Sequence, residues 1–105
     1  MNLSELKKAG GFIHAEPVKS PVHWRGHSFD VFVKRLAFGD VEALLAGQDD
    51  RSRSAKMIAA SILLGPDQEP ISYDDAYRLD VSLATKLIEA INTANGTPGG
   101  SDLPN

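Results

Sequence analysis

The chain has 105 residues, of which 42% are hydrophobic and 24% charged, with a net charge of -3 and no cysteine. These values are typical of one small globular domain, and they exclude a disordered chain, a disulfide framework, thiolate zinc sites and a cysteine nucleophile. The acidic balance also argues against nucleic-acid binding, because phosphate contacts require basic side chains.

Neither secretion nor membrane insertion is indicated. The N-terminus lacks the apolar run of a signal peptide. The longest apolar stretch, residues 57–64, is far shorter than the roughly 20 residues that a membrane span needs. We therefore expect a protein of the cytoplasm.

The N-terminal part begins with a short helical turn and continues without regular structure. Residues 4–9 predict the turn, with Leu3 and Leu6 on one side, and the glycine pair 10–11 ends it. The stretch from Phe12 to Ser20 contains a proline and precedes another, so we expect it to be extended and irregular.

Residues 21–35 give the clearest local pattern, which predicts a β-hairpin. Taking Gly26-His27 as a two-residue type II′ loop places Trp24 opposite Phe29. The same register places His23 opposite Asp30 and Val22 opposite Val31. Because strand side chains alternate with period two, one face is apolar and the other mostly polar. The apolar face holds Val22, Trp24, Phe29, Val31 and Val33.

The middle of the chain predicts one helix and leaves one segment open. Residues 38–46 have apolar side chains at helical spacing, and 48–54 form a polar loop. A short apolar run such as 55–64 fits either a buried strand or a helix. We favour a third strand over 57–64, with a helix over 54–62 as the alternative.

Two further helices are predicted near the C-terminus. Ser72 is a suitable N-cap for a short helix over 73–79, and Asp80 caps a longer one. The longer helix has one apolar stripe. The stripe consists of Leu83, Ala84, Leu87, Ile88 and Ile91.

These elements together predict an α+β fold: a small antiparallel sheet built on the 21–35 hairpin, with a third strand over 57–64, packed against three to four helices. We expect a single domain over residues 1–96. The tail over 97–105 is rich in glycine and proline, which predicts disorder.

The sequence contains no pattern that requires catalysis or a cofactor. His23, His27 and Asp30 could be drawn as a metal site, but a turn histidine and a cross-strand charge pair explain them. Asp74, Asp75 and Asp80 lie at predicted helix starts, where carboxylates are favoured. No serine lies in a GxSxG setting, and no phosphate-binding glycine loop is present. We therefore predict that the protein is not an enzyme and binds other proteins.

Four residues are our candidates for contact with a partner. Phe12 and Ile13 are apolar and lie outside the regular elements, while Arg51 and Arg53 belong to a polar loop. The lone Trp24 fits the protein's own core better than a partner's surface.

Several stretches in a fixed order resemble the phage tail assembly chaperone families of long-tailed phages and prophages. The resemblance covers about residues 3–95 and has no single chemical motif. The stretches are LKKAGGFIHAEPVKSPVHW, FDVFVKRLAFGDVEALL, DRSRSAKMIAASILLG and EPISYDDAYRLDVSLATKLIEAIN.

This resemblance implies a non-enzymatic role in the cytoplasm of the bacterial host. Such chaperones hold the long tape-measure protein soluble and help tail-tube subunits assemble around it, so the implied partners are tape-measure and tail-tube proteins. We also expect reversible self-association. The alternative is a small structural component of the phage tail or of the head–tail connector.

Overall fold

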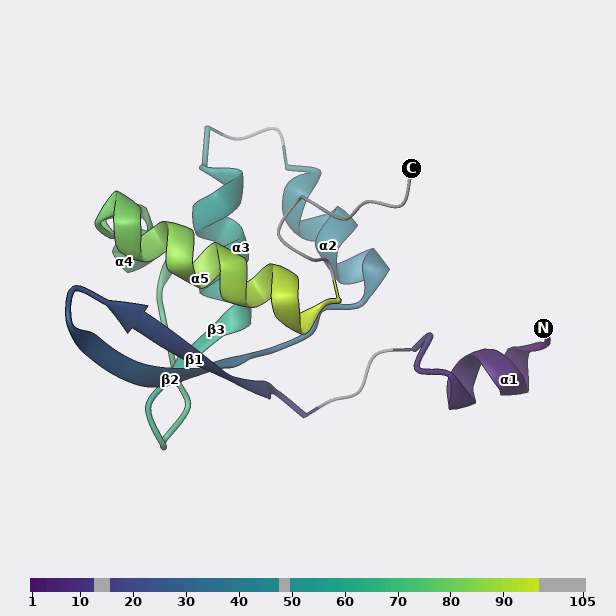
Figure 1. Cartoon of the computed structure of the whole chain (residues 1–105). Helices are drawn as coiled ribbons and strands as arrows, with labels where there is room; N and C mark the ends of the chain where they lie inside the picture. Colours follow the sequence, from purple (N-terminus) through teal and green to yellow (C-terminus); the bar gives the residue numbers. More distant parts are fainter. Residues whose placement is uncertain (13–15, 48–49, 97–105) are drawn as a thin grey trace, which may run out of the picture.

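The computed structural model describes residues 1–12, 16–47 and 50–96. These residues form five helices and one antiparallel sheet with the strand order β1-β2-β3-β4, which confirms the predicted α+β class. Figure 1 shows α1 (Leu3–Lys8) apart from the other elements, which gather around one core. The tail predicted to be disordered lies outside the described residues.

The hairpin is formed by β1 (Val18–Trp24) and β2 (His27–Val33). β1 starts three residues earlier than predicted, so Pro21 lies inside a strand. A proline is tolerated there because β1 is at the edge of the sheet.

The turn of the hairpin differs from the prediction by one residue. Arg25 and Gly26 form the loop with φ values of 49° and 81°, and a type I′ turn requires positive φ at both positions. Val22 therefore pairs with Phe29, and Trp24 pairs with His27. Each partner is shifted by two positions from the predicted one. Because side chains alternate with period two, the apolar face keeps the predicted residues.

The ambiguous segment is both helix and strand. Residues 53–61 form α3 (Arg53–Ser61), and only the last three apolar residues form β3 (Ile62–Leu64). The predicted strand over 57–61 was wrong, and the predicted loop ends at Ser52. The hydroxyl of Ser52 accepts a hydrogen bond from the backbone N–H of Ala55 at 3.1 Å, which starts the helix.

The helix passes directly into the strand. Ile62, which caps α3, already has extended φ and ψ values of -95° and 130°. The N–H of Lys34, just after β2, donates to the carbonyl of Ser61 at 2.7 Å. β3 then pairs with β2, so this junction joins the helical layer to the sheet.

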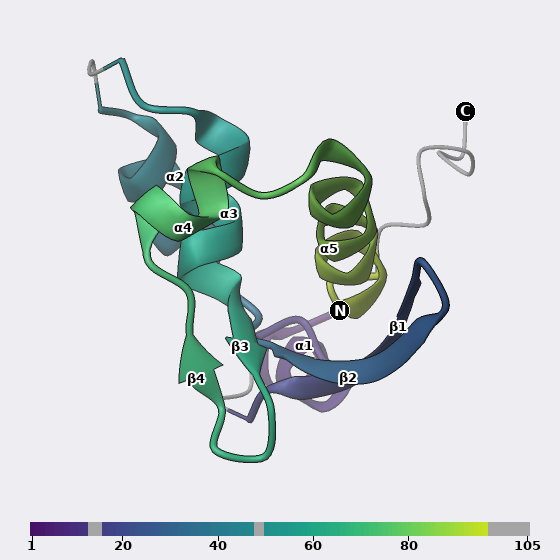
Figure 2. The same ribbon diagram turned by 90° about the vertical axis from the view of Figure 1, so that its left-hand side faces the viewer.

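The last elements complete the sheet and the helical layer. β4 (Glu69–Pro70) pairs with β3 and was not predicted. α4 (Tyr73–Tyr77) is shorter than predicted, and α5 (Val81–Ala94) follows it. Figure 2 shows α5 lying across the curved hairpin, with α3 and α4 beside it.

One cluster of buried side chains joins the sheet to α3, α4 and α5. Its members come from β1, β2, α3, β3, the segment before α4, α4 itself and α5. They are Val22, Val31, Val33, Ala55, Ile58, Ile62, Ile71, Ala76, Leu87, Ala90 and Ile91. The predicted stripe of α5 faces this cluster, since each of its residues is buried or half-buried.

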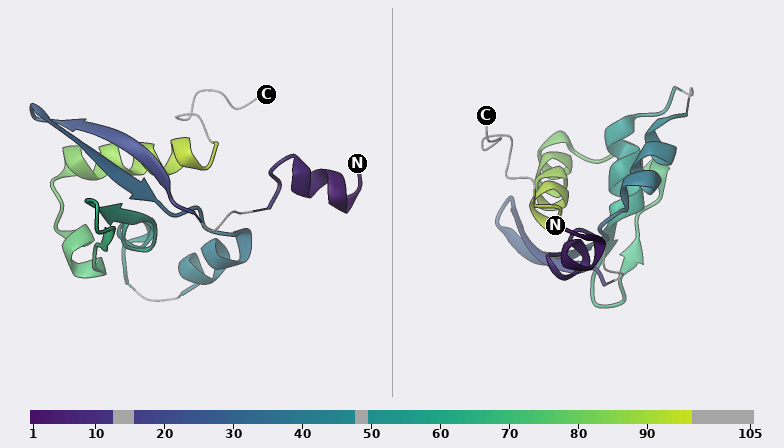
Figure 3. Two further views of the ribbon diagram at one scale, coloured as in Figure 1. Left: turned by 90° about the horizontal axis from the view of Figure 1, so that it is seen from below. Right: turned by 90° about the vertical axis from the view of Figure 1, so that its right-hand side faces the viewer.

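Two helices contribute nothing to the buried cluster. α1 and α2 (Phe38–Leu45) each have no buried residue. Figure 3 shows α1 projecting away from the sheet and α2 at the margin of the helical layer.

Ile58 provides the test of the core. It is among the largest fully buried side chains, so Ile58→Ala leaves a cavity and should lower the free energy of unfolding by about 2–5 kcal/mol. Chemical denaturation measures this loss. Phe38→Ala is the matched control, because Phe38 is 78% exposed and its removal should change stability by no more than about 0.5 kcal/mol. Equal losses for both variants would contradict the assigned core.

Candidate functional site

The histidines and Asp30 do not converge. His23 Nδ1 lies 2.8 Å from Ser28 Oγ, and Asp30 lies 3.5 Å from the ammonium of Lys19. The predicted cross-strand pair of His23 and Asp30 was therefore wrong, because the register differs. His27 is in β2 and not in the turn, with its ring stacked on Trp24 at 6.2 Å between centroids. Within residues 1–12, 16–47 and 50–96, no three His, Asp or Glu side chains are grouped to hold a metal ion.

The acidic residues near the C-terminus act as helix caps or first-turn residues, as predicted. Asp74 and Asp75 lie in the first turn of α4, which Ser72 caps through the N–H of Asp75 at 3.1 Å. Asp80 caps α5 by accepting a hydrogen bond from the N–H of Ser82 at 3.0 Å.

Asp80 also belongs to a polar cluster that fastens the hairpin turn to α5. The hydroxyl of Ser82 donates to Asp80 and accepts from Nε1 of Trp24 at 2.8 Å. Arg25 lies 5.0 Å from the Trp24 ring and 3.4 Å from the Asp80 carboxylate. The hydrogen bond from the Ser82 hydroxyl is the largest effect on the pKa of Asp80 and lowers it. Desolvation opposes this, but the backbone N–H of Ser82 and the charge of Arg25 add to the lowering, so the pKa stays below its usual value. Trp24 is half-buried by these contacts, so it serves the protein's own packing.

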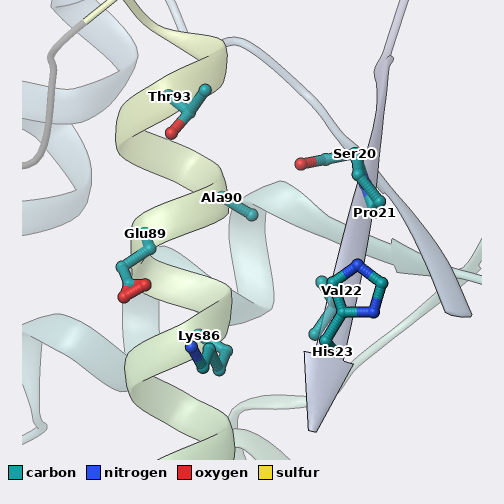
Figure 4. A pocket seen from close by; sticks show the side chains of 8 residues that line it. All are labelled: Ser20, Pro21, Val22, His23, Lys86, Glu89, Ala90 and Thr93. Carbon is teal, nitrogen blue, oxygen red and sulfur yellow. The ribbon is translucent and has the colours of Figure 1, made fainter. Parts of the chain in front are cut away.

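An open cleft of about 310 Å³ lies between β1 and α5. Figure 4 shows His23 on the strand side and Lys86 and Glu89 on the helix side, with Ala90 pointing toward the strand. The residues that line the cleft include neither a pair of carboxylates nor a nucleophile beside a base. Polar, charged and apolar side chains line this cleft together, and their arrangement is not that of a catalytic site.

The first exposed apolar surface is the N-terminal arm, which we define as residues 2–12. Every residue in it is exposed, although three of its side chains are large and apolar. Leu3, Leu6 and Phe12 are 60%, 41% and 46% exposed. The ammonium of Lys7 lies 5.7 Å from the centre of the Phe12 ring.

Local hydrogen bonds close the arm's helix at both ends. At the start, Asn2 and Glu5 form a reciprocal capping box. At the end, the N–H groups of Gly10 and Gly11 donate to the carbonyls of Lys7 and Leu6 at 3.2 and 2.8 Å. This pair of bonds is a Schellman motif, and Gly10 supplies the positive φ of 87° that it requires. The arm is therefore shaped by its own sequence rather than by packing against the core.

A second exposed surface surrounds Tyr73 and Tyr77. Their rings lie 6.0 Å apart, and the guanidinium of Arg51 lies 5.0 Å from the Tyr73 ring. Tyr77 is 66% exposed. Arg51 thus joins an aromatic surface of the kind that is enriched at protein interfaces.

The four predicted contact residues do not form one site. Phe12 lies in the arm, and Arg51 lies beside Tyr73. Arg53 is exposed at the start of α3. Ile13 lies outside the described residues. Their role in binding stays a prediction.

Sequence reasoning missed the apolar residues of the exposed helices. Leu3 and Leu6 were placed on one side of a helical turn, and that turn is too short to bury them without a partner. Phe38 was counted with the helix-forming apolar residues, yet it points outward. The sequence pattern alone does not distinguish an apolar residue that packs in the core from one that stays exposed.

Both edges of the sheet carry a proline. β1 contains Pro21, and β4 ends at Pro70. Proline lacks the N–H that an added strand would need, so both edges are poorly suited to pairing with a partner's strand. Exposed side chains, rather than the sheet edges, are therefore the candidate surfaces for contact with a partner.

The geometry describes a small α+β protein with exposed apolar helices and, in the part described, no cluster of catalytic or metal-binding groups. The sequence model of the family described as "Phage tail assembly chaperone, TAC" matches residues 4–95. The chain belongs to this family, whose members assist assembly and are not enzymes, as predicted. No curated protein and no solved structure matches the chain.

Family membership places the protein's partners among phage tail proteins and its action in the host cell. None of the described helices combines the length and the apolar character needed to cross a membrane.

Asp80 supplies a test of the cluster at the hairpin turn. Its carboxyl should titrate below 3.8, measured by NMR of the side-chain carbon. A carboxyl with a lowered pKa in the folded state adds stability above its unfolded pKa and loses that contribution as pH falls through the folded value. Ser82→Ala should raise the pKa toward the ordinary value, whereas Ser82→Thr, which keeps the hydroxyl, should not. An unchanged pKa in Ser82→Ala would show that Ser82 is not its main cause.

Proposed function

We propose that the protein holds a tape-measure protein soluble through its N-terminal arm while tail-tube subunits assemble around it, in the cytoplasm of the bacterial host. The observation that carries the proposal is the arm itself. It is a capped helix followed by an aromatic residue, with every apolar side chain exposed.

The short length of α1 supports this role. A helix of six residues without tertiary packing is well below the roughly 12–15 residues at which isolated helices become marginally stable in water. Its capping bonds favour the helix, and burial of Leu3 and Leu6 against a partner would complete it. A long helical client offers the apolar stripe that such a short helix can pack against.

The proline-bearing sheet edges support the same choice of surface. Strand addition is a common way to hold an unfolded client, but it requires a free edge with regular N–H groups. β1 and β4 each interrupt that row with a proline. Side-chain contacts by the arm are therefore the better-supported route to the client.

The double variant Leu3→Glu and Leu6→Glu tests this function. Glutamate is a good helix former, so the arm should keep its helix while losing its apolar face. Co-expressed with the tape-measure protein of the same tail gene cluster, the variant should leave the client as insoluble as it is without a chaperone. The measurement is the soluble fraction of the tape-measure protein, together with its recovery in a pull-down.

Val81→Glu is the matched control, because Val81 is 80% exposed on α5 and lies outside the arm. It should hold the client as the unmodified protein does. Both substitutions should change the free energy of unfolding by no more than about 0.5 kcal/mol. If the arm variant keeps the tape-measure protein soluble, the arm is not the client-binding surface. If the unmodified protein has no effect, the proposed function itself fails.

A further inference from the structure

Two helices of this protein expose large apolar side chains, Leu3 and Leu6 on α1 and Phe38 on α2. Their sequences also match each other in pattern. α1 presents Leu3, Leu6 and Lys7 at positions i, i+3 and i+4. α2 presents Phe38, Val41 and Glu42 at the same spacing. Residues at this spacing lie on one face of a helix. The two faces are alike in their apolar pair and opposite in charge.

The face of α2 is open to a partner. Phe38 is 78% exposed, and a Cβ added at Gly39 would meet nothing within 4 Å. Glu42 is exposed, and Val41 is half-buried. A ring as large as that of Phe38 at the margin of a small protein loses favourable burial unless something covers it.

The charges of the two helices are complementary beyond this matched pair. α1 has Lys7 and Lys8 in its last turn, and its one acidic side chain, Glu5, accepts a hydrogen bond from the N–H of Asn2. The charged residues of α2 are Asp40 and Glu42, both acidic. Opposite charges around a small apolar contact select the partner and its orientation.

We propose that the N-terminal arm of one copy docks on α2 of a second copy, with Leu3 and Leu6 against Phe38 and Lys7 beside Glu42. The second copy is the occupant because the same chain supplies both halves of the complementary pair. Figure 1 shows α1 and α2 well separated within one molecule. Because the two contacting surfaces differ, the contact is either exchanged reciprocally in a closed pair or repeated in an open chain.

This contact deepens the proposed function, and it rests on that function for its biological meaning. The arm that would hold the client is covered by α2 of another copy while no client is present. The client then competes with α2 for the same apolar residues. Apolar surface is thereby hidden in the free chaperone, which limits non-specific aggregation.

Cross-linking between two single-cysteine variants tests the contact directly, since the natural chain has no cysteine. Ala9→Cys and Gly39→Cys proteins, whose substitutions lie beside the proposed contact and leave Leu6 and Phe38 in place, are mixed, one of them isotopically labelled, and treated with a short bis-maleimide. The expected product is a mixed dimer that joins position 9 of one copy to position 39 of the other. Mass spectrometry identifies both the linked positions and the copy from which each came.

Val81→Cys replaces Gly39→Cys in the control mixture, because Val81 is 80% exposed and lies outside α2. Its yield of mixed dimer should be at background. Equal yields with Val81→Cys and Gly39→Cys would overturn the proposal. So would a cross-link that forms only within single molecules of an Ala9→Cys/Gly39→Cys chain at high dilution, because the arm would then dock on its own α2.

A charge-reversal cycle provides the second test. By sedimentation velocity, Lys7→Glu alone and Glu42→Lys alone should each weaken self-association about three- to tenfold. The chain with both substitutions, or a mixture of the two single variants, should regain most of the original affinity. Weakening that is merely additive in the doubly substituted chain would contradict a direct contact between these two positions.

Phe38→Ala separates this inference from the proposed function. It should weaken self-association by about tenfold and leave the tape-measure protein soluble on co-expression. A failed cross-link together with normal client solubility would overturn the docking of the arm on α2 alone. Normal cross-linking with no effect on the client would overturn the proposed function alone.

Discussion

Burial of Val31 and Val33 on β2 is the constraint on which the rest of the fold depends. β2 is the strand that pairs with both β1 and β3, and these two valines are fully buried. Their apolar face must be covered, and α3 and α5 supply the side chains that cover it, among them Ile58 and Leu87. Complete burial of this one cluster determines the strand register. It also determines where α3 passes into β3 at Ser61 and where α5 lies.

A chain of this size builds one such cluster and has little apolar surface left for a second. α1 and α2 lie outside it. Leu3, Leu6 and Phe38 of these helices stay exposed, and the other large apolar residues of α2 are only half-buried. In a protein whose family works by binding, this exposure has a consistent explanation. The proline on each sheet edge disfavours strand pairing there, which supports the proposed use of the helical faces.

The sequence predicted those parts of the fold whose signals are local. Three predictions were correct: the cap at Asp80, the stripe of α5 and the apolar face of the hairpin. Each of these features depends on neighbours a few residues away. The hairpin turn was predicted one residue too late. Arg25 adopts a positive φ, which a non-glycine residue rarely does. The helix-to-strand change at Ser61 could not be predicted, since no glycine or proline marks it and the pairing of β3 with β2 decides it. For the proposed binding surface, Phe12 was a candidate from the sequence, but the sequence had no means of separating the exposed leucines of α1 from core residues.

In the proposed function, the modest size of the arm would allow the protein to release its client. Complete burial of each large apolar side chain contributes about 1.5–3 kcal/mol, and association costs about 4–15 kcal/mol in lost freedom of motion. The three apolar side chains of a single arm therefore give weak, quickly reversed binding. A long client can engage many copies at once, and the effective concentration along it raises the total affinity without strengthening any one contact. Under the proposed function, many weak contacts would together hold a long protein in solution and still allow tail-tube subunits to displace the copies one by one.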